Sequence, residues 1–197
     1  LHPHAPNGGA AASAARTRVR KPAEASPQTA PSRAECMDAA GFPAGVFNLI
    51  NGDGAGVGTQ LSVHKDVDMV SFTGSARAGT IISKNAADTL KRVHLELGGK
   101  GANIVFSDAD EKAVKRGVLH CMNNTGQSCN APTRMIVPKS RQNEALEIAK
   151  NVAEGLITGD PTKEETDIGP VVSQTQFDKV QRLIDSGIKA GAQLVTG

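Results

Sequence analysis

Short apolar segments alternate with segments of helical spacing from Lys21 onward, and this alternation constrains the fold of the 197-residue chain more than any other feature. We expect strands at 45–50, 67–72, 92–97, 102–106 and 134–138. We expect helices at 31–40, 76–90 and 140–153, and a further helix that begins at Ser107. Strands and helices that alternate at these lengths are typical of α/β folds with a parallel sheet.

Two of the expected helices carry apolar side chains on one face. In the helix that begins at Ser107, the side chains that recur at every fourth residue predict one buried stripe of Val114, Val118 and Met122. A capping box of Ser173 and Gln176 opens the last helix, whose predicted buried residues are Phe177, Val180, Ile184 and Ile188. The closing "AQLVTG" resembles the start of another strand, so the sequence is typical of a fragment.

Composition argues against several classes of function. The chain has no Trp or Tyr and only five Phe, which leaves little for stacking on nucleic-acid bases. A formal net charge of +2 gives no reason to expect a polyanionic partner, and no run of about 20 apolar residues could span a bilayer. Residues 1–20 lack acidic side chains and apolar periodicity, so we expect a disordered or artefactual tail, with a transit peptide as the second interpretation.

The cysteines Cys36, Cys121 and Cys129 show neither metal nor disulfide spacing, which favours free thiols in a reducing compartment such as the cytoplasm, and we predict no metal site. Most isolated cysteines are inert core residues, and Cys36 and Cys121 are interpreted that way. Cys129 instead lies in "NNTGQSCNAPTR" (123–134), a run of small polar residues. Such neighbours leave room for a substrate and offer free backbone N–H groups, so Cys129 is the candidate nucleophile.

Two glycine-rich turns follow apolar strands. "NGDGAGVGTQ" (51–60) does not fit the G-x-G-x-x-G fingerprint, and a flexible turn that needs positive φ is the simpler interpretation. In "SFTGSARAG" (71–79), Gly74 and Ser75 lie where a strand runs into a helix. The N–H groups of a first helical turn attract phosphate oxygens, although Ser75 acting as an ordinary N-cap explains the same residues equally well.

Glu96 ends a strand of alternating residues and comes shortly before Gly98 and Gly99. Open α/β sheets carry their sites at the carboxyl ends of strands. A carboxylate in this position, followed by backbone that can bend, is therefore a candidate site residue.

"FTGSARAG", "LELGGK" and "NNTGQSCNAPTR", in this order and at these separations, resemble the NAD(P)-dependent aldehyde dehydrogenase superfamily. "KPAEASP" resembles its cofactor-binding signature, and "GFPAGVFNLINGDG" resembles the strand and turn that follow it. The resemblance extends from about Lys21 to the last residue. It implies part of a Rossmann-like NAD-binding domain at 21–97 and part of the catalytic domain at 98–197, both incomplete.

The resemblance implies a chemical role for two residues. Cys129 would attack the carbon of a small aldehyde, and its own backbone N–H would hold part of the resulting oxyanion. Glu96 would then act as the general base that activates water to hydrolyse the thioester, releasing a carboxylic acid.

The resemblance also implies six cofactor residues: Lys21 and Glu24 for the adenosine ribose, Gly74 and Ser75 for the pyrophosphate, Gly79 for close helix packing and Leu97 for the carboxamide. A carboxylate beside the ribose would repel a 2′-phosphate, which favours NAD over NADP. Members of the family are usually homo-oligomers, which implies a second copy of the chain as the expected partner.

The chain departs from the family pattern in several places. Family chains are much longer, and their Pro-Trp-Asn and Glu-x-Phe-Gly-Pro segments have no counterpart here, while Arg18 and Arg20 replace an apolar strand before Lys21. Three functions therefore stay open. They are oxidation of an aldehyde with NAD, an inactive fragment that retains partner binding or weak nucleotide binding, and a cofactor-independent thiol esterase that uses Cys129 and Glu96.

Overall fold

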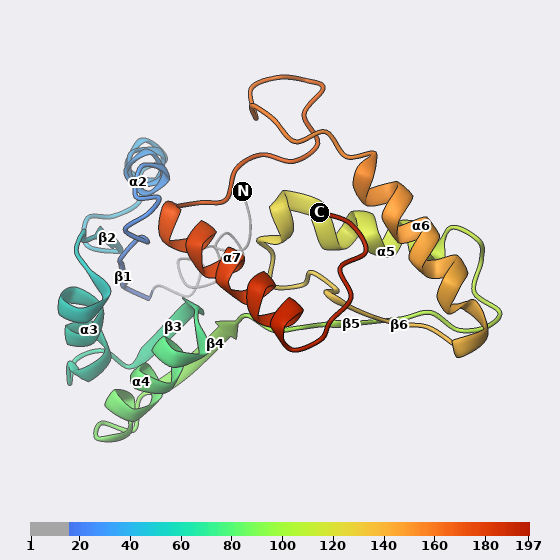
Figure 1. Cartoon of the computed structure of the whole chain (residues 1–197). Helices are drawn as coiled ribbons and strands as arrows, with labels where there is room; N and C mark the ends of the chain where they lie inside the picture. The colour runs from blue at the N-terminus through green and yellow to red at the C-terminus, as the bar shows by residue number, and fades with distance from the viewer. Residues whose placement is uncertain (1–15) are drawn as a thin grey trace. The chain divides into compact units, whose positions relative to one another are not determined.

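The computed structural model describes residues 16–197 and divides the chain into two compact units, with the boundary between Glu96 and Leu97. Both units are mixed α/β (Figure 1). The boundary lies one residue before the predicted one, whereas the assignment of the two units to cofactor binding and to catalysis stays a prediction.

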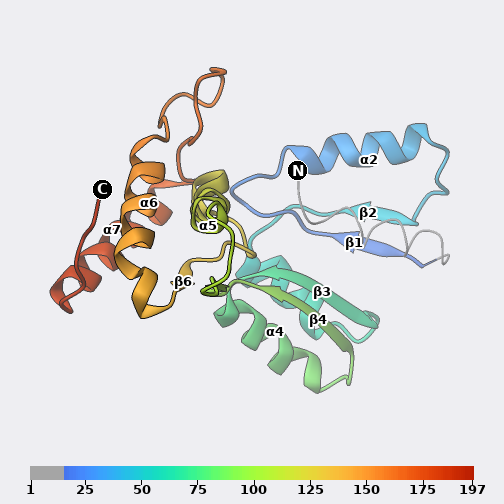
Figure 2. The ribbon, with the colours of Figure 1, turned by 90° about the vertical axis from the view of Figure 1, so that its right-hand side faces the viewer.

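In the first unit, strands and helices alternate along the chain. In order, its elements are β1 (Arg18–Arg20), α2 (Thr29–Ala39), β2 (Phe47–Leu49), the π-helical turn η1 (Gly54–Gly58), α3 (Thr59–Val63), β3 (Met69–Gly74), α4 (Ala76–Ala87) and β4 (Arg92–Leu97). β1 and β2 pair in parallel, and helix α2 packs beside them (Figure 2). The Arg92 N–H donates to the Asp68 carbonyl at 3.0 Å, so the paired strands β3 and β4 begin side by side and run in the same direction.

The predicted tail extends too far. Residues 1–15 lie outside the described part of the chain, but Arg18–Arg20 form β1, in register with Phe47–Leu49. The Arg18 N–H donates to Val46 and the Ile50 N–H donates to Arg20, at 2.9 and 3.0 Å. Backbone pairing of this kind needs no apolar side chain, which is why the hydrophobic pattern does not reveal the strand.

Burial and charge repulsion both act on the arginines of β1. Burial lowers the pKa of Arg18, and the nearby charges of Arg20 and Arg33 lower this pKa further. The pKa of Arg20 is lowered by burial and then by Arg33, and its Nη1 atom is buried without a hydrogen-bond partner among residues 16–197. The burial of Arg18 and Arg20 and the repulsion between their charges therefore lower the stability of the first unit.

Arg20→Leu is therefore expected to raise the free energy of unfolding by about 1 kcal/mol, because it removes a buried polar atom that lacks a partner. Urea denaturation of the purified chain measures the change. Arg16→Leu, at an exposed position, is the matched control and should change the unfolding free energy by less than about 0.5 kcal/mol. A less stable Arg20→Leu variant would contradict the interpretation.

The glycine-rich segment 51–60 is largely helical rather than a flexible turn. Asp53 caps η1, and its Oδ1 accepts a hydrogen bond from the Gly56 N–H at 2.7 Å. Positive φ is needed at Gly52 alone in this segment, where a Cβ atom would lie 2.3 Å from Cγ2 of Val57. The aspartate cap explains the difference, because it satisfies N–H groups at the start of a helix.

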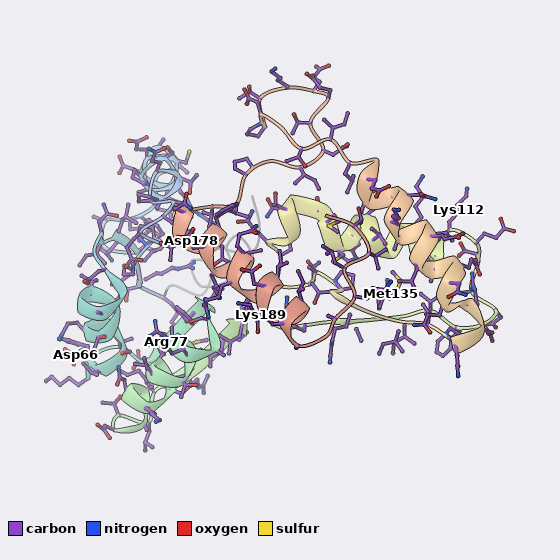
Figure 3. All side chains as sticks on the ribbon, viewed as in Figure 1. Asp66, Arg77, Lys112, Met135, Asp178 and Lys189 are labelled. Carbon is purple, nitrogen blue, oxygen red and sulfur yellow. The ribbon has the colours of Figure 1, made fainter. Side chains whose placement is uncertain are left out.

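In the second unit, one parallel pair of strands packs with two helices. Its elements are β5 (Ala102–Ile104), α5 (Ala113–Met122), the 3₁₀ turn η2 (Asn123–Gly126), β6 (Arg134–Ile136), the 3₁₀ turn η3 (Lys139–Arg141), α6 (Gln142–Glu154) and α7 (Gln174–Lys189). The core consists of Val105, Val114, Val118 and Ala145, and Met135, labelled in Figure 3, packs against it. Within residues 16–197 the strands form three separate pairs, β1–β2, β3–β4 and β5–β6, whereas the alternation of elements predicts a parallel sheet without such a division.

The helix predicted from Ser107 begins at Ala113 instead. Asp110 explains the later start, because its Oδ1 accepts the Lys112 N–H at 2.9 Å and so holds a turn before the helix. Val114 and Val118 are buried as predicted, but Met122, at the end of the helix, is 36% exposed.

The Asp110 carboxylate accepts two bonds from the Arg116 guanidinium, at 2.6 and 2.9 Å. These bonds, together with the Lys112 N–H, lower the pKa of Asp110 from 3.8 to about 2. A carboxyl group whose pKa is lowered in the folded state stabilises the fold at pH values above its ordinary pKa. That contribution is lost as the pH falls through the lowered pKa. The ion pair should therefore stabilise the chain at neutral pH and not at pH 2 or below.

Asp110→Asn is expected to lower stability at pH 7, and the difference from the parent chain should shrink between pH 4 and pH 2. Chemical denaturation at several pH values measures it. The neighbouring exposed residue Asp108 provides the control substitution, Asp108→Asn, which should leave stability nearly unchanged at pH 7. A difference between Asp110→Asn and the parent that is independent of pH would contradict the prediction.

Helix α7 starts as predicted, with the Ser173 hydroxyl accepting from the Gln176 N–H at 3.3 Å. Its predicted burial is wrong, since Phe177, Ile184 and Ile188 are 44–46% exposed and Val180 is only partly buried. No element of the second unit packs extensively against α7, and "AQLVTG" forms no strand. Apolar spacing shows which face a helix can bury, but burial also needs a partner.

Candidate active site

The loop before Cys129 has an unusual backbone. Asn124, Thr125 and Gly126 are consecutive residues in the left-handed region, with φ of 52°, 60° and 70°. Asparagine and glycine tolerate this region, but a β-branched threonine there is a genuine outlier that costs about 1–3 kcal/mol. Backbone strain of this kind clusters at functional sites.

Hydrogen bonds hold the strained loop 124–127, both within the loop and to a distant segment of the chain. The Thr125 hydroxyl donates to the Gly169 carbonyl at 2.9 Å, and the Val172 N–H donates to Oε1 of Gln127 at 2.8 Å. Gln127 Nε2 and Asn124 Nδ2 each donate to the other residue's carbonyl at 3.2 Å. The loop is therefore fixed both internally and to the Gly169–Val172 segment.

Cys129 follows this loop with an exposed free thiol. Its backbone N–H donates to no acceptor within the part of the chain that the structure describes. Cys121 is partly buried, whereas Cys36 is exposed on α2, so the interpretation of Cys36 as a core residue is wrong. The buried side of α2 is occupied by Ala30 instead.

Glu96 lies on the exposed face of β4, in a strand whose residues alternate between exposed and half-buried. His94 shares this face, with its Nε2 atom 3.7 Å from Oε1 of Glu96. Sequence reasoning missed His94, although two residues of separation on a strand places both side chains on one face. Glu96 belongs to the first unit and Cys129 to the second.

Lys21 and Glu24 come together at the turn after β2. The Lys21 ammonium donates to the Pro22 and Gly52 carbonyls at 2.7 and 2.9 Å, and it lies 3.7 Å from the Glu24 carboxylate. Glu24 Oε1 also accepts the Gly54 N–H at 2.5 Å. The glycine-rich segment 51–60, which does not fit the dinucleotide fingerprint, thus contacts both candidate ribose residues. The pairing of β1 with β2 brings this segment next to them.

The start of α4 suits an anion. Ser75 caps the helix by accepting the Ala78 N–H at 3.2 Å, which confirms the N-cap interpretation. The first turn contains no acidic residue, and the exposed Arg77, labelled in Figure 3, adds a positive charge. Free N–H groups at a helix start attract phosphate oxygens, so this end of α4 fits a pyrophosphate.

Gly74, Gly79 and Leu97 occupy three different settings. A Cβ atom on Gly74 would lie 2.4 Å from the Phe72 ring, so a larger residue here would require that ring to move. Gly79 is buried within α4, and Leu97 is the half-buried last residue of β4. All three settings are compatible with the implied roles, which stay predictions.

Within residues 16–197, none of the helices has the length and apolar character that a membrane-spanning helix needs. No group of three or more His, Cys, Asp or Glu side chains in the same range could hold a metal ion.

A sequence profile of the aldehyde dehydrogenase family matches residues 7–197. The chain belongs to the aldehyde dehydrogenase family. The resemblance seen in the motifs is thereby confirmed, while its expected start at about Lys21 is wrong because the match begins earlier. The matched range therefore includes residues 7–20 as well.

Several aldehyde dehydrogenases are similar to this chain over a limited part of their own length. The 3-succinoylsemialdehyde-pyridine dehydrogenase of a Pseudomonas species is 53% identical over 182 residues, covering 92% of this chain and 38% of that enzyme. The crystal structure of an aldehyde dehydrogenase from Bartonella henselae is 59% identical with a TM-score of 0.90 over the same shares. Aldehyde dehydrogenase C from Pseudomonas syringae, solved with NAD⁺ and octanal, is 48% identical with a TM-score of 0.90. The chain spans about 38% of the length of these relatives.

Proposed function

We propose that this aldehyde dehydrogenase chain carries out the oxidation of an aldehyde to a carboxylic acid with NAD, through a covalent intermediate on Cys129. The observation that carries the proposal is the site of the thiol. Cys129 is exposed and free, and it follows a strained loop that long-range hydrogen bonds hold in place.

Cys129 would act as the nucleophile. Its thiolate sulfur forms a bond to the aldehyde carbon, and the carbonyl oxygen takes the electron pair of the C=O π bond. The Cys129 N–H, which has no acceptor among the described residues, can donate to that oxyanion. An exposed loop with small neighbours gives the aldehyde access to the sulfur.

NAD, when bound, supplies the acceptor for the hydride that leaves the aldehyde carbon. The N-terminal turn of α4 and Arg77 would hold its pyrophosphate. Lys21 Nζ has three hydrogens and donates two of them to carbonyls, so the third could donate to a ribose hydroxyl beside the Glu24 carboxylate, which lies 3.7 Å away. Oε2 of Glu24 accepts no hydrogen bond among residues 16–197 and could accept one from the ribose, and the negative charge of Glu24 favours NAD over NADP.

Glu96 would serve as the general base for hydrolysis of the thioester. Its carboxylate lies on the exposed face of β4 and can take a proton from water as the water attacks the acyl carbon. In this proposal the first unit binds the cofactor and the second carries the nucleophile. A homo-oligomer in the cytoplasm stays our prediction for the assembly and its compartment.

An inactive fragment is the second candidate, and two observations favour it. The chain covers 38% of its relatives' length, and α7 exposes an apolar face. Such a chain would retain partner binding or weak nucleotide binding without turnover.

One pair of assays separates the candidates. The purified chain is incubated with NAD and a small aldehyde while NADH absorbance is followed, and then with a nitrophenyl ester in the absence of NAD. NADH formation supports the proposal, and ester cleavage alone indicates a cofactor-independent thiol esterase. No product in either assay, with cooperative unfolding still observed, indicates the inactive fragment.

A further inference from the structure

We propose that Thr125 and Gln127 are positioning residues for Cys129, and that the Gly169–Val172 segment braces the nucleophile loop through them. The inference rests on the proposed function only in taking Cys129 as the nucleophile. Neither side chain is assigned a part in the chemistry itself.

The brace is non-local. The Thr125 hydroxyl reaches the Gly169 carbonyl across 44 positions of sequence, and Gln127 Oε1 accepts from the Val172 N–H across 45. Both contacts lie within the second unit. Two anchor points, four and two residues before Cys129, therefore fix the direction in which the chain approaches the thiol.

The backbone explains why a brace is needed. Local preference does not keep a threonine at φ 60° and ψ 30°, so Thr125 stays there only where its surroundings determine it. The Thr125 bond to Gly169 supplies that constraint, and the crossed bonds between Asn124 and Gln127 close the loop around it. Without the brace, we expect the loop to relax and Cys129 to lose its orientation.

Two substitutions at Thr125 separate the hydroxyl from the shape of the side chain. Thr125→Val keeps the β-branch and loses the donor to Gly169. Thr125→Ser keeps the donor and loses the branch. Gln127→Met keeps a similar length but removes both the acceptor for the Val172 N–H and the donor to the Asn124 carbonyl, and it provides a second variant should Thr125→Val fail to fold.

The measurement is the rate of alkylation of each cysteine by iodoacetamide as a function of pH, followed by mass spectrometry on the full 197-residue chain. Thr125→Val and Gln127→Met should each slow alkylation of Cys129 at pH 7 by about tenfold, the size of effect that one lost hydrogen bond produces. Thr125→Ser should restore the parent profile, and Cys36 and Cys121 should react at parent rates throughout.

Thr89→Val provides the matched control, because the Thr89 hydroxyl also donates to a backbone carbonyl, at 3.4 Å, but in the first unit. It should leave the Cys129 profile unchanged. A folded Thr125→Val or Gln127→Met variant with the parent alkylation rate at Cys129 would overturn the proposal, as would equal slowing of all three cysteines. Iodoacetamide needs neither NAD nor aldehyde, so a chain that makes no NADH but shows the predicted profiles would reject the proposed function and keep the brace.

Discussion

Cys129→Ala is expected to reduce NADH formation from NAD and a small aldehyde to background, a loss of at least about 10⁴-fold. A methyl group cannot form the bond to the aldehyde carbon, so hydride transfer has no covalent intermediate from which to occur. NADH absorbance at saturating NAD measures the loss. The unfolding free energy should change little, because the Cys129 side chain is exposed and packs against no core.

Cys36→Ala and Cys121→Ala are the matched controls. Cys36 shares the exposed free thiol, and Cys121 lies eight residues from Cys129 on α5. Both variants should retain the parent rate within about twofold. If Cys129→Ala keeps its activity, or if Cys121→Ala loses it, the nucleophile has been assigned to the wrong sulfur.

Glu96→Gln should separate the two halves of the reaction. Formation of the thioester on Cys129 does not require a base to activate water, so a first turnover should release about one NADH per chain. Hydrolysis then proceeds without its general base, and the steady rate should fall by about 10²–10⁴-fold. Stopped-flow absorbance at a known chain concentration resolves the burst from the slow phase.

Hydroxylamine provides an independent test of Glu96 as the general base. It attacks a thioester without help from a base, so its addition should restore turnover in Glu96→Gln. His94→Gln, beside Glu96 on β4, is the matched control and should show no burst followed by a slow phase. A Glu96→Gln variant that lacks the burst would mean that Glu96 acts before the thioester forms.

The spacing of apolar residues and the positions of helix-capping and turn residues predicted most of the first unit. Strand 92–97 forms as expected from its alternating residues, and helix α4 begins at Ala76 as expected from Ser75 before it. The strand at Arg18–Arg20 could not be predicted from hydrophobic periodicity, because two of its three side chains are charged and the pairing with β2 defines it. The exposure of the apolar face of α7 could not be predicted either, since burial depends on a neighbour that the helix sequence does not encode.

The part of the candidate site that depends on residues adjacent in sequence was predictable. Small polar residues around Cys129 indicate an accessible thiol, and the structure places it in an exposed loop. The brace from Thr125 and Gln127 was not predictable, because each bond joins residues more than 40 positions apart. The contact of Lys21 and Glu24 with the Gly52–Gly54 turn was missed for the same reason, since a strand pair brings the two segments together.

We claim that an acyl group forms on the Cys129 sulfur, and mass spectrometry can locate that group in the sequence. Glu96→Gln is mixed with NAD and a small aldehyde, quenched in acid and digested with trypsin, which releases residues 117–134 with both Cys121 and Cys129. Fragmentation of this peptide should place the mass of the acyl group on Cys129, and only when NAD is present. An unmodified Cys129, or an acyl group on Cys121, would contradict the claim.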